Sequence, residues 1–590
     1  MSHRVPVLAL IVVASLAVAT LGCSSEAPST TATTLSSEER LAWFKHDKFG
    51  MFVHWGPYSA LGGEWNDRRV EVGDIAEWIM QRLEIPVAEY REKAREFNPV
   101  EFDARSIVKL AKDAGMRYLV FTAKHHDGFA MYHSKVSEYN IIDWTRFDRD
   151  PIAELAEECR KQGIRFGLYY SHREDWDEPF AYGNTWDFDF DPEQDLETFE
   201  REYLDVKAKP QLREVLSNYG EISLLWFDRG IYTPEQAKQF ADIVHELQPK
   251  ALINGRIGSY GQELLGDYQN TSDNLMPPGG IEEYWETPQT HNHTWGYSKF
   301  DEEWKSPAEI VRRLVDIVSK GGNYLLNIGP DGLGRVPQPS IETLTRVGEW
   351  MNVNSESIYG TTPSPFAKLP WGACTVKGET LYLHLFEWPA DGRLALEGLR
   401  NEVRSVRLLT DPDGSLEFSR EGNTVLIDGP LQAPDPLDSV LVMEVVGTPE
   451  VDPITVPQND DGSFRLDYLA AITRGRVVKR FNRKGEFHIS KWQAPEDEIV
   501  WHLDVSNPGT FAVEITYAAM EDRVGGPYEI GAGDSRVTAE VEPTGDWYEY
   551  ETFRLGTIDL AGGPQTVEIH PRRELSEDLM YFKAIELKPR

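Results

Sequence analysis

A carboxylate stands at the end of a buried apolar strand that the sequence predicts. Asp228 directly follows the run Leu-Leu-Trp-Phe at 224–227. A carboxylate in such a place costs free energy unless it is paired or has a function. Its alternative role would be to cap the next helix, but Thr233 suits that position better, with Pro234 as the first helical residue. Asp228 is therefore available for chemistry.

Other polar and aromatic side chains stand at the ends of the remaining predicted strands. In a parallel barrel the carboxyl ends of the strands meet at one rim, where catalytic residues gather. A single histidine at a strand end is more often structural, but the whole set predicts one binding rim. Its members are His54-Trp55-Gly56, Lys124-His125-His126-Asp127-Gly128-Phe129, Tyr169-Tyr170-Ser171-His172, Asp228, Asn254-Gly255-Arg256 and Asn327.

Two segments after Asp228 offer a second carboxyl group. Hydrolysis of a glycosidic bond uses one carboxylate to attack the anomeric carbon and another carboxyl to protonate the leaving oxygen and then activate water. Asp273 lies in the segment 266–274, and Glu286 lies in Tyr-Trp-Glu-Thr at 284–287. A retaining pair is about 5 Å apart. The sequence does not reveal which of the two approaches Asp228 at that distance.

A metal site is the alternative interpretation of His125 and His126. Adjacent residues of a strand point to opposite faces, so a shared metal ion would require a bulge. Apart from Cys23, the cysteines are Cys159 and Cys374, which are too few for a disulfide framework or for zinc bound by thiolates. We therefore expect no metal and no cofactor.

Amphipathic helices alternate with short apolar strands between about residues 39 and 355. This alternation predicts a parallel sheet covered by helices. We expect an α/β fold, a (β/α)8-like TIM barrel in which six strands can be placed, over 39–355. A doubly wound open sheet is the alternative, and the lack of a Gly-rich phosphate loop after the first strand weakens it. The clearest example has Ile107, Leu110, Ala111 and Ala114 at helical spacing, then Gly115 and the strand 118–124.

The pattern changes after residue 356 to short alternating segments separated by Gly, Asp and Pro. Such segments are typical of antiparallel β-sandwich domains. We expect one sandwich at 356–447, a linker at 448–462 and a second sandwich at 463–590. The second resembles modules that accompany glycan-degrading enzymes, and its aromatic residues predict carbohydrate binding if they are exposed. Such residues, among them Trp492, Trp501 and Trp547, belong more often to a core.

The N-terminus has the pattern of an export signal. Arg4 precedes an apolar run at 5–21, and Gly22-Cys23 follows. This is typical of a signal peptide at 1–22, and Cys23 is the predicted lipidation site, followed by a Ser/Thr-rich linker at 23–38. We expect a bacterial cell-envelope lipoprotein, in the periplasm or at the outer membrane, bound to the membrane through its lipid. An uncleaved membrane anchor and ordinary secretion are the alternatives.

Composition excludes one class of partner. The chain has 590 residues with a formal net charge of −37, and 41% of its residues are hydrophobic. A strongly acidic chain without a basic cluster is unsuited to bind nucleic acid. The hydrophobic content is enough to build large cores, so the chain is globular.

Five motifs, in order, resemble those of glycoside hydrolase family 29, the α-L-fucosidases. The resemblance covers about residues 39–365. It rests on Phe49-Gly-Met-Phe-Val-His-Trp-Gly-Pro-Tyr-Ser59, Ala123-Lys-His-His-Asp-Gly-Phe129, Trp226-Phe-Asp228, Trp285-Glu-Thr287 with Thr294-Trp-Gly-Tyr297, and Asn323-Tyr-Leu-Leu-Asn-Ile-Gly-Pro330.

The resemblance implies a barrel, no metal and double displacement with Asp228 as the nucleophile. Asp273 lies in the stretch that usually supplies the acid/base and is favoured, and Glu286 is the rival. Arg229 departs from the small residue that often follows the nucleophile, which bears on leaving-group preference. The implied substrate-binding residues are His54, Glu77, Trp78, His125, His126, Tyr170, Trp226 and Arg256.

The expected activity is therefore exo-acting, retaining release of terminal α-L-fucose from fucosylated glycans. A second hypothesis is a glycan-binding lipoprotein on an inactive barrel. A third is a retaining glycosidase for a related sugar such as an α-galactoside, which shares most hydroxyl orientations. The C5 methyl group of fucose requires an apolar wall, which Trp and Phe residues near the strand ends can supply.

Overall fold

The computed structural model describes residues 36–260, 263–481, 486–520 and 526–590. All elements below belong to one compact unit, Leu35–Arg590. The predicted signal peptide and Cys23 lie outside the described residues. In the part that is described, no helix is long and apolar enough to cross a membrane.

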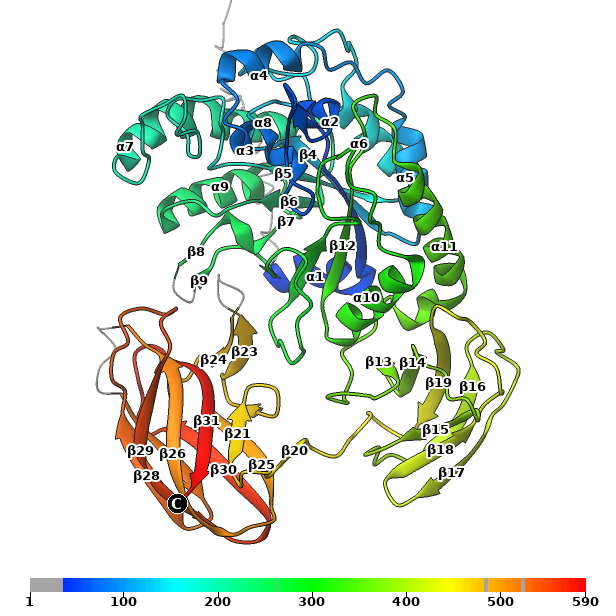
Figure 1. The fold of residues 1–590 in the computed structure, drawn as a ribbon, viewed down its shortest axis with the longest axis vertical. Coiled ribbons are helices and arrows are strands. Elements are labelled where there is room, and N and C mark those ends of the chain that lie inside the picture. The colour runs from blue at the N-terminus through cyan, green and yellow to red at the C-terminus, as the bar shows by residue number, and fades with distance from the viewer. Residues whose placement is uncertain (1–35, 261–262, 482–485, 521–525) are drawn as a thin grey trace, which may run out of the picture. The chain divides into compact units, whose positions relative to one another are not determined.

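Eight parallel strands form the central sheet (Figure 1). Its order is β10-β11-β12-β1-β4-β5-β6-β7, and a parallel bridge between Asn254 and Tyr268 joins the two ends. The predicted (β/α)8-like TIM barrel is confirmed. The strands are β1 (Phe49–Val53), β4 (Tyr118–Lys124), β5 (Arg165–Tyr170), β6 (Leu224–Phe227), β7 (Leu252–Ile253), β10 (Gln269–Asn270), β11 (Trp285–Gln289) and β12 (Asn323–Ile328).

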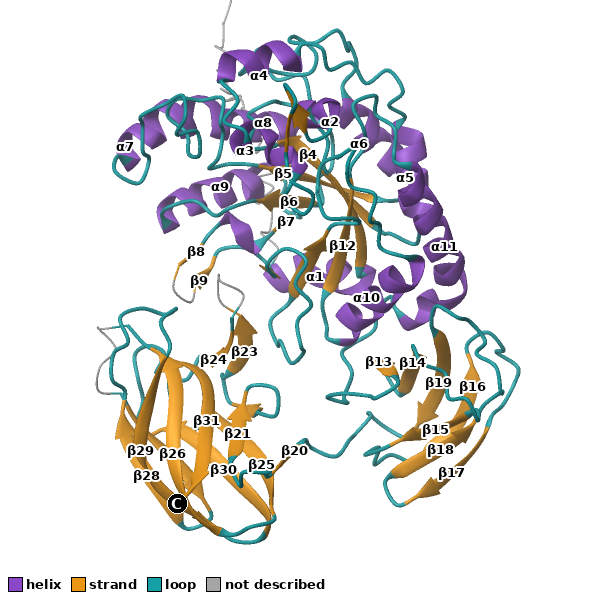
Figure 2. Cartoon of the chain, viewed as in Figure 1, coloured by secondary structure: helices purple, strands orange, loops and turns teal. Residues whose placement is uncertain are grey.

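Helices cover the outside of this sheet (Figure 2). Their ends follow local chemistry: Thr233 caps α9 with its side chain and Pro234 opens that helix, as predicted. The helices are α1 (Ser37–Asp47), α2 (Pro57–Leu61), α3 (Ile79–Arg82), α4 (Val87–Ala94), α5 (Ala104–Asp113), α6 (Pro151–Gln162), α7 (Leu196–Phe199), η2 (Glu200–Ala208), α8 (Lys209–Asn218), α9 (Pro234–Leu247), α10 (Pro307–Ser319) and α11 (Gln338–Asn354).

Short elements complete the loops of the barrel. The start of α1 at Ser37 falls inside the segment 23–38 that we expected to be a linker, because Ser36 and Glu39 form a capping box there. The remaining elements are β2 (Glu64–Trp65), β3 (Arg68–Arg69), η1 (Ala76–Trp78), η3 (Gly255–Ile257), β8 (Ser259–Tyr260), β9 (Glu263–Leu264) and η4 (Ser355–Ser357).

The two faces of the sheet bury different sets of side chains. Alternate residues such as Phe52, Tyr169 and Trp226 fill the barrel interior. Their neighbours Val53, Tyr170 and Phe227 face the helices. This two-residue period continues past the strand ends and decides which residues reach the site.

The first sandwich packs a four-stranded sheet and a three-stranded sheet around one core, which confirms the predicted antiparallel class. The four-stranded sheet has the order β13-β14-β19-β16 and the other β15-β18-β17. The strands are β13 (Gly372–Lys377), β14 (Thr380–Leu385), β15 (Arg393–Leu396), β16 (Val403–Leu408), β17 (Glu417–Glu421), β18 (Thr424–Asp428) and β19 (Ser439–Val445).

The second sandwich has two six-stranded sheets. One contains β20 (Thr455–Pro457), β22 (Ile472–Arg474), β25 (Glu498–Val505), β27 (Pro527–Ala532), β28 (Ser535–Glu540) and β30 (Gly563–Pro571). The other contains β21 (Phe464–Asp467), β23 (Val478–Phe481), β24 (Phe487–Ser490), β26 (Gly509–Ala518), β29 (Glu551–Leu560) and β31 (Tyr581–Pro589). β20 lies inside the expected linker 448–462, where it pairs with the edge of β25.

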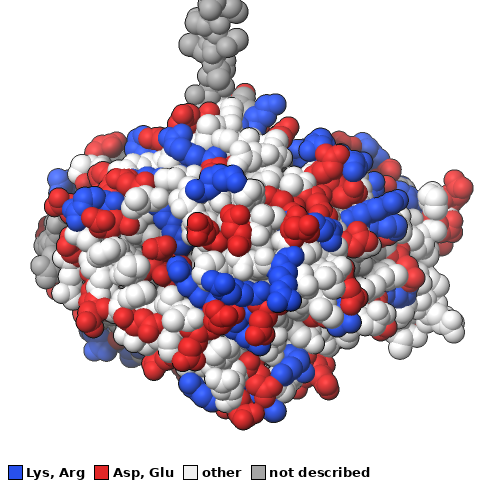
Figure 3. Space-filling model, turned by 90° about the horizontal axis from the view of Figure 1, so that it is seen from above, with Lys and Arg blue, Asp and Glu red and all other residues white. Residues whose placement is uncertain are grey.

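The buried apolar side chains and the charged surface are those of a globular protein, as the composition predicted. Trp492 and Trp501 are buried in the core of the second sandwich, and Trp547 is buried in a small separate cluster with Ala518 and Tyr581, so these residues do not offer a stacking surface. Cys159 and Cys374 are buried free thiols. Acidic and basic side chains are interspersed over the face shown in Figure 3.

Candidate active site

Asp228 lies at the carboxyl end of β6 and continues its alternation. Trp226 points into the barrel and Phe227 toward the helices, so Asp228 points inward again. One carboxylate oxygen accepts hydrogen bonds from Arg256 Nη1 (3.0 Å) and the Arg229 backbone N–H (2.8 Å). The other accepts from the Tyr169 hydroxyl (3.1 Å) and lies 3.5 Å from His126 Nε2.

These partners keep Asp228 ionised. Burial alone would raise the pKa of this carboxyl, but His126 and Arg256 outweigh burial and hold the pKa well below its usual range. An ionised carboxylate that donors hold in place is suited to act as a nucleophile.

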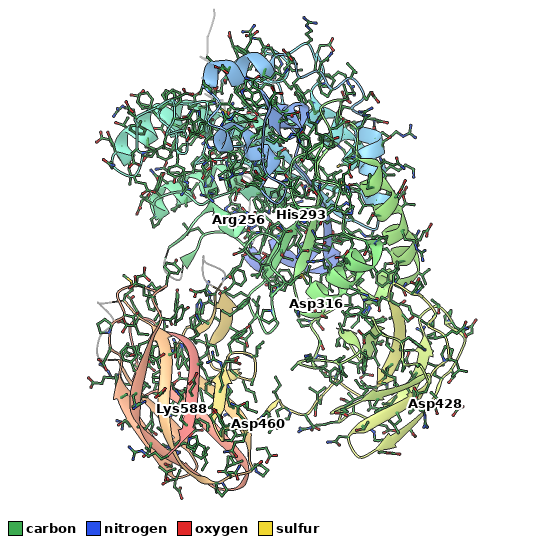
Figure 4. All side chains as sticks on the ribbon, in the orientation of Figure 1. Arg256, His293, Asp316, Asp428, Asp460 and Lys588 are labelled. Carbon is green, nitrogen blue, oxygen red and sulfur yellow. The ribbon has the colours of Figure 1, made fainter. Side chains whose placement is uncertain are left out.

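Arg256 connects Asp228 to a second carboxylate. It lies on η3, just after β7, and is labelled in Figure 4. Its Nη2 donates to Asp273 and to the Thr271 carbonyl (3.1 Å). Its guanidinium also lies 4.8 Å from the centre of the Trp226 ring. The Asp273 side chain is 44% exposed, against 13% for Asp228, so Asp273 borders solvent while the two share one cation.

Glu286 lies deeper, in the barrel interior. Its carboxylate accepts hydrogen bonds from Trp226 Nε1 (2.9 Å) and the Tyr118 hydroxyl (2.9 Å). Tyr268 and Asn270 donate to it as well. Burial outweighs these bonds and raises the pKa of Glu286 to about 7. This placement makes Glu286 a support for Trp226, and it favours Asp273 as the second carboxyl at the rim.

Three histidines line the same region. His54 Nδ1 lies 2.8 Å from Asn327 Oδ1, and the Asn327 amide donates to the Trp295 carbonyl (2.7 Å). The amide oxygen therefore faces His54, so Nδ1 donates and Nε2 remains an acceptor. Burial lowers the pKa of His54 to about 3, which keeps the ring neutral and suited to bind a hydroxyl group.

His125 and His126 both border the site although they are consecutive. Their ring centres are 4.3 Å apart, because the pairing of β4 with β5 shifts register between Thr122 and Lys124. His125 stacks on Tyr169, and His126 Nδ1 lies 2.7 Å from Ser171 Oγ. Among the described residues no group of three or more His, Cys, Asp or Glu side chains is arranged to hold a metal ion.

Glu77 and Trp78, on η1, form another wall. One Glu77 oxygen accepts from the Gly296 N–H (2.9 Å) and the Thr294 hydroxyl (3.2 Å). The other oxygen is buried and has no partner among the described residues, so it can accept a ligand hydroxyl. Burial raises the pKa of Glu77 to about 7. The Trp78 ring lies edge-on to His126 at 5.2 Å.

Comparison with known protein families decides to which family a chain with this site belongs. The model of the family described as alpha-L-fucosidase matches residues 18–356, more than half of the chain. The chain belongs to the α-L-fucosidase family. It is thus a glycoside hydrolase.

Individual relatives agree with the family. The tissue alpha-L-fucosidase of Rattus norvegicus is 29% identical over 461 residues, covering 74% of this chain and 89% of its own length. Among solved structures, the alpha-L-fucosidase from Vibrio sp. strain EJY3 has a TM-score of 0.68 and 31% identity, covering 95% of this chain and 99% of that one. Isoenzyme 1 from Paenibacillus thiaminolyticus has a TM-score of 0.62 and 36% identity, covering 70% and 99%.

One predicted residue of this fucosidase-family site is misplaced. Tyr170 points toward the helices, where its hydroxyl donates to Gln211 (3.0 Å). Tyr169, its neighbour, points inward and contacts Asp228. The structure thus places Tyr169, and not the predicted Tyr170, beside Asp228, because a strand buried on both faces shows no polar alternation in its sequence that would fix which side chain points inward.

The structure brings the other predicted residues together. His54, His125, His126, Trp226 and Arg256 are linked to Tyr169 or Asp228 by ring contacts or hydrogen bonds. Glu77-Trp78 joins them through the contact of Trp78 with His126. The sequence contains another Glu-Trp pair, Glu64-Trp65 in the β2–β3 hairpin, and there Glu64 forms surface ion pairs with Arg69 and Lys299. Their roles in catalysis and binding stay predictions.

Sequence reasoning missed the partners of Arg229. Its guanidinium pairs with the buried Glu174 (2.8 Å) and lies 5.5 Å from the Trp78 ring centre. Arg229 itself has a left-handed backbone, with φ of 68°. Glu174 lies in an irregular loop, so only the folded chain reveals this contact.

Proposed function

We propose that this chain is an exo-acting, retaining α-L-fucosidase that releases terminal fucose from fucosylated glycans. Asp228 attacks the anomeric carbon while Asp273 gives a proton to the departing oxygen, leaving a fucosyl ester on Asp228. Asp273 then takes a proton from water, and the resulting attack on the anomeric carbon frees Asp228. The observation that supports this most is the ionised, inward Asp228 joined through Arg256 to the more exposed Asp273.

The shared contact with Arg256 limits the distance between the two carboxylates, which bears on retention. A retaining pair is about 5 Å apart, whereas an inverting pair is about 6.5–9.5 Å apart to admit a water molecule. One guanidinium that contacts both carboxylates holds them close. Asp273 must leave Arg256 and gain a proton before it can act as an acid.

The surrounding groups suit fucose. The neutral His54 ring and the unpaired Glu77 oxygen can each accept a hydrogen bond from a sugar hydroxyl group. Phe52, Tyr169 and Trp226 form a connected aromatic surface, with Tyr169 and Trp226 stacked at 5.6 Å. Such a surface supplies the apolar wall that the C5 methyl group needs.

The test compares hydrolysis of 4-nitrophenyl α-L-fucoside and α-D-galactoside by the wild type and by Asp228→Ala. We expect fucose release, with the first product detected by NMR as the α-anomer, and loss of nearly all turnover in the variant. Because subtilisin loses about 10⁴-fold or more without a triad member, a similar loss is expected here. Normal activity in Asp228→Ala rejects the nucleophile, a β-anomer rejects retention, and preference for galactoside changes the substrate.

Localisation is part of the same proposal. Cleavage before Cys23 and attachment of lipid to its thiol would place the enzyme at the cell envelope, where extracellular glycans reach it. Expression with labelled palmitate tests this. Label on the wild type and none on Cys23→Ser is expected; an unlabelled wild type rejects the anchor.

A further inference from the structure

The loop between β10 and β11 carries Asp273 near its start. The loop spans 271–284, and its first part is tied to the barrel. The Thr287 hydroxyl donates to the Leu275 carbonyl (2.8 Å), and Lys320 Nζ donates to the Pro277 carbonyl (2.7 Å). Its last part, Ile281, Glu282 and Glu283, is held differently; we call these three residues the anchor segment.

Charged groups of the second sandwich hold the anchor segment. Glu282 accepts from the Thr473 hydroxyl (2.6 Å), and its backbone N–H donates to the Lys479 carbonyl (3.2 Å). Glu283 is bound by two cations, Lys491 Nζ at 2.9 Å and Arg480 Nη2 at 3.1 Å.

These ion pairs are more than surface contacts. The Arg480 side chain is 8% exposed and that of Glu283 19%, so solvent screens their attraction poorly. Glu283 also accepts a hydrogen bond from Gln269 on β10, which links the sandwich to a barrel strand. Removing the Glu283 charge takes away a partly buried counter-charge that both cations contact, which is costly.

An apolar contact accompanies the ion pairs. Ile281 of the anchor segment and Phe481, at the end of β23, are both buried members of the barrel's main hydrophobic cluster. Met276 of the same loop and Phe487 of β24 pack against that cluster. The hairpin β23–β24 (Figure 1) thus completes part of the barrel core beside the loop.

We propose that the second sandwich is a positioning element of the active site, which fixes the β10–β11 loop through Glu282 and Glu283 and so sets the place of Asp273. This inference rests on the proposed role of Asp273 as the acid/base. The Asp273 side chain is 44% exposed. Among the described residues, the side chain that binds it is that of Arg256. Strand β11 holds the backbone on both sides of Asp273, through Thr271 N–H to the Glu286 carbonyl (3.0 Å) and Asn274 N–H to the Pro288 carbonyl (3.0 Å), and the anchor segment fixes the other end of the same loop. A displacement of Asp273 by about 1 Å can cost about 100-fold in rate.

The test uses the full chain with both glutamates replaced, Glu282→Gln with Glu283→Gln. Glu514→Gln is the matched control, since Glu514 also binds two cations, Arg554 and Lys588, on β26 of the same sandwich. Aryl α-L-fucosides with good and poor leaving groups are compared, because only poor leaving groups need the acid. We expect kcat/KM, which reports the steps up to the fucosyl-enzyme and not its hydrolysis, to fall by about 10-fold on the poor leaving group and by less than about 2-fold on the good one. The control should match the wild type on both.

The two cations that bind Glu283 give an independent approach. Arg480→Gln with Lys491→Gln should reproduce the same selective loss, and adding Glu283→Gln to these two changes should reduce the rate little further, since the same ion pairs are removed twice. An equal loss on both substrates, or no loss in a folded variant, overturns the proposal.

Asp273→Ala separates this inference from the proposed function. If Asp273→Ala lowers kcat/KM equally for good and poor leaving groups, Asp273 is not the acid, and the positioning role of the second sandwich is rejected as well. If Asp273→Ala shows a dependence on the leaving group and the glutamate variants do not, the positioning role alone is rejected.

Discussion

At the scale of single residues, Tyr169 and Tyr170 form a matched pair for testing which side chain serves the site. Tyr169→Phe removes the hydroxyl that donates to Asp228. A hydrogen bond to a charged group contributes about 1.5–3 kcal/mol, so kcat/KM on an aryl fucoside should fall by about 10- to 100-fold. Tyr170→Phe removes only the bond to Gln211 and should leave kcat/KM near the wild type. A loss of kcat/KM in Tyr170→Phe and none in Tyr169→Phe would show that Tyr170, and not Tyr169, serves the site.

A second residue-scale prediction concerns the buried Glu286 and pH. Its pKa rises from 4.5 to about 7 on folding, so between these values the native state binds more protons than the unfolded state. The free energy of unfolding must then fall as pH rises through this window, by about 3 kcal/mol for this group. Glu77 and Asp127, each with a pKa of about 7, act in the same direction.

Glu286→Gln should therefore flatten this pH dependence without abolishing it. The measurement is the thermal unfolding midpoint of both proteins from pH 5 to pH 8. Glu197→Gln is the control, because the Glu197 side chain is 93% exposed. A variant whose midpoint falls with pH as steeply as that of the wild type would show that Glu286 does not titrate in this range.

At the scale of elements, Gly50 on β1 shows how tightly the barrel interior supports the site. A Cβ at Gly50 would lie 2.4 Å from the ring of Tyr118, which donates to Glu286. Gly50→Ala must displace that ring and should cost about 1–3 kcal/mol, with a lower thermal midpoint. Gly509→Ala on β26 meets no atom within 4 Å and should change the midpoint little. An unchanged midpoint for Gly50→Ala would mean that Tyr118 moves freely.

The composition of each strand also determines whether that strand can be recognised from the sequence. The six strands with apolar runs were predictable. In contrast, β10 consists of the two polar residues Gln269 and Asn270, and β11 contains Pro288 and the buried Glu286, so neither shows a strand pattern. Strand ends placed Asp228 and the histidines at one rim, because parallel strands end together. The choice between Tyr169 and Tyr170, and the contact of Glu174 with Arg229, required the folded chain.

At the scale of the whole molecule, the acidic surface predicts how ionic strength selects among substrates. The chain has 97 acidic and 60 basic residues, so its long-range field repels anions, although Figure 3 shows both signs interspersed locally. A neutral aryl α-L-fucoside has no net charge for this field to act on. Its kcat/KM should change by less than about 2-fold between low salt and 0.5 M salt, a range over which the Debye length shrinks several-fold (it is about 10 Å at 0.1 M and about 3 Å at 1 M).

A sulfated aryl fucoside should behave differently, because repulsion lowers its encounter rate until salt screens the field. We expect its kcat/KM to rise by about 3- to 10-fold over the same range. The neutral substrate controls for direct effects of salt on the enzyme. A fall in kcat/KM for the sulfated substrate on adding salt would contradict the argument and would show that cations of the site, such as Arg256 beside Asp228, attract the anion more strongly than the net charge repels it.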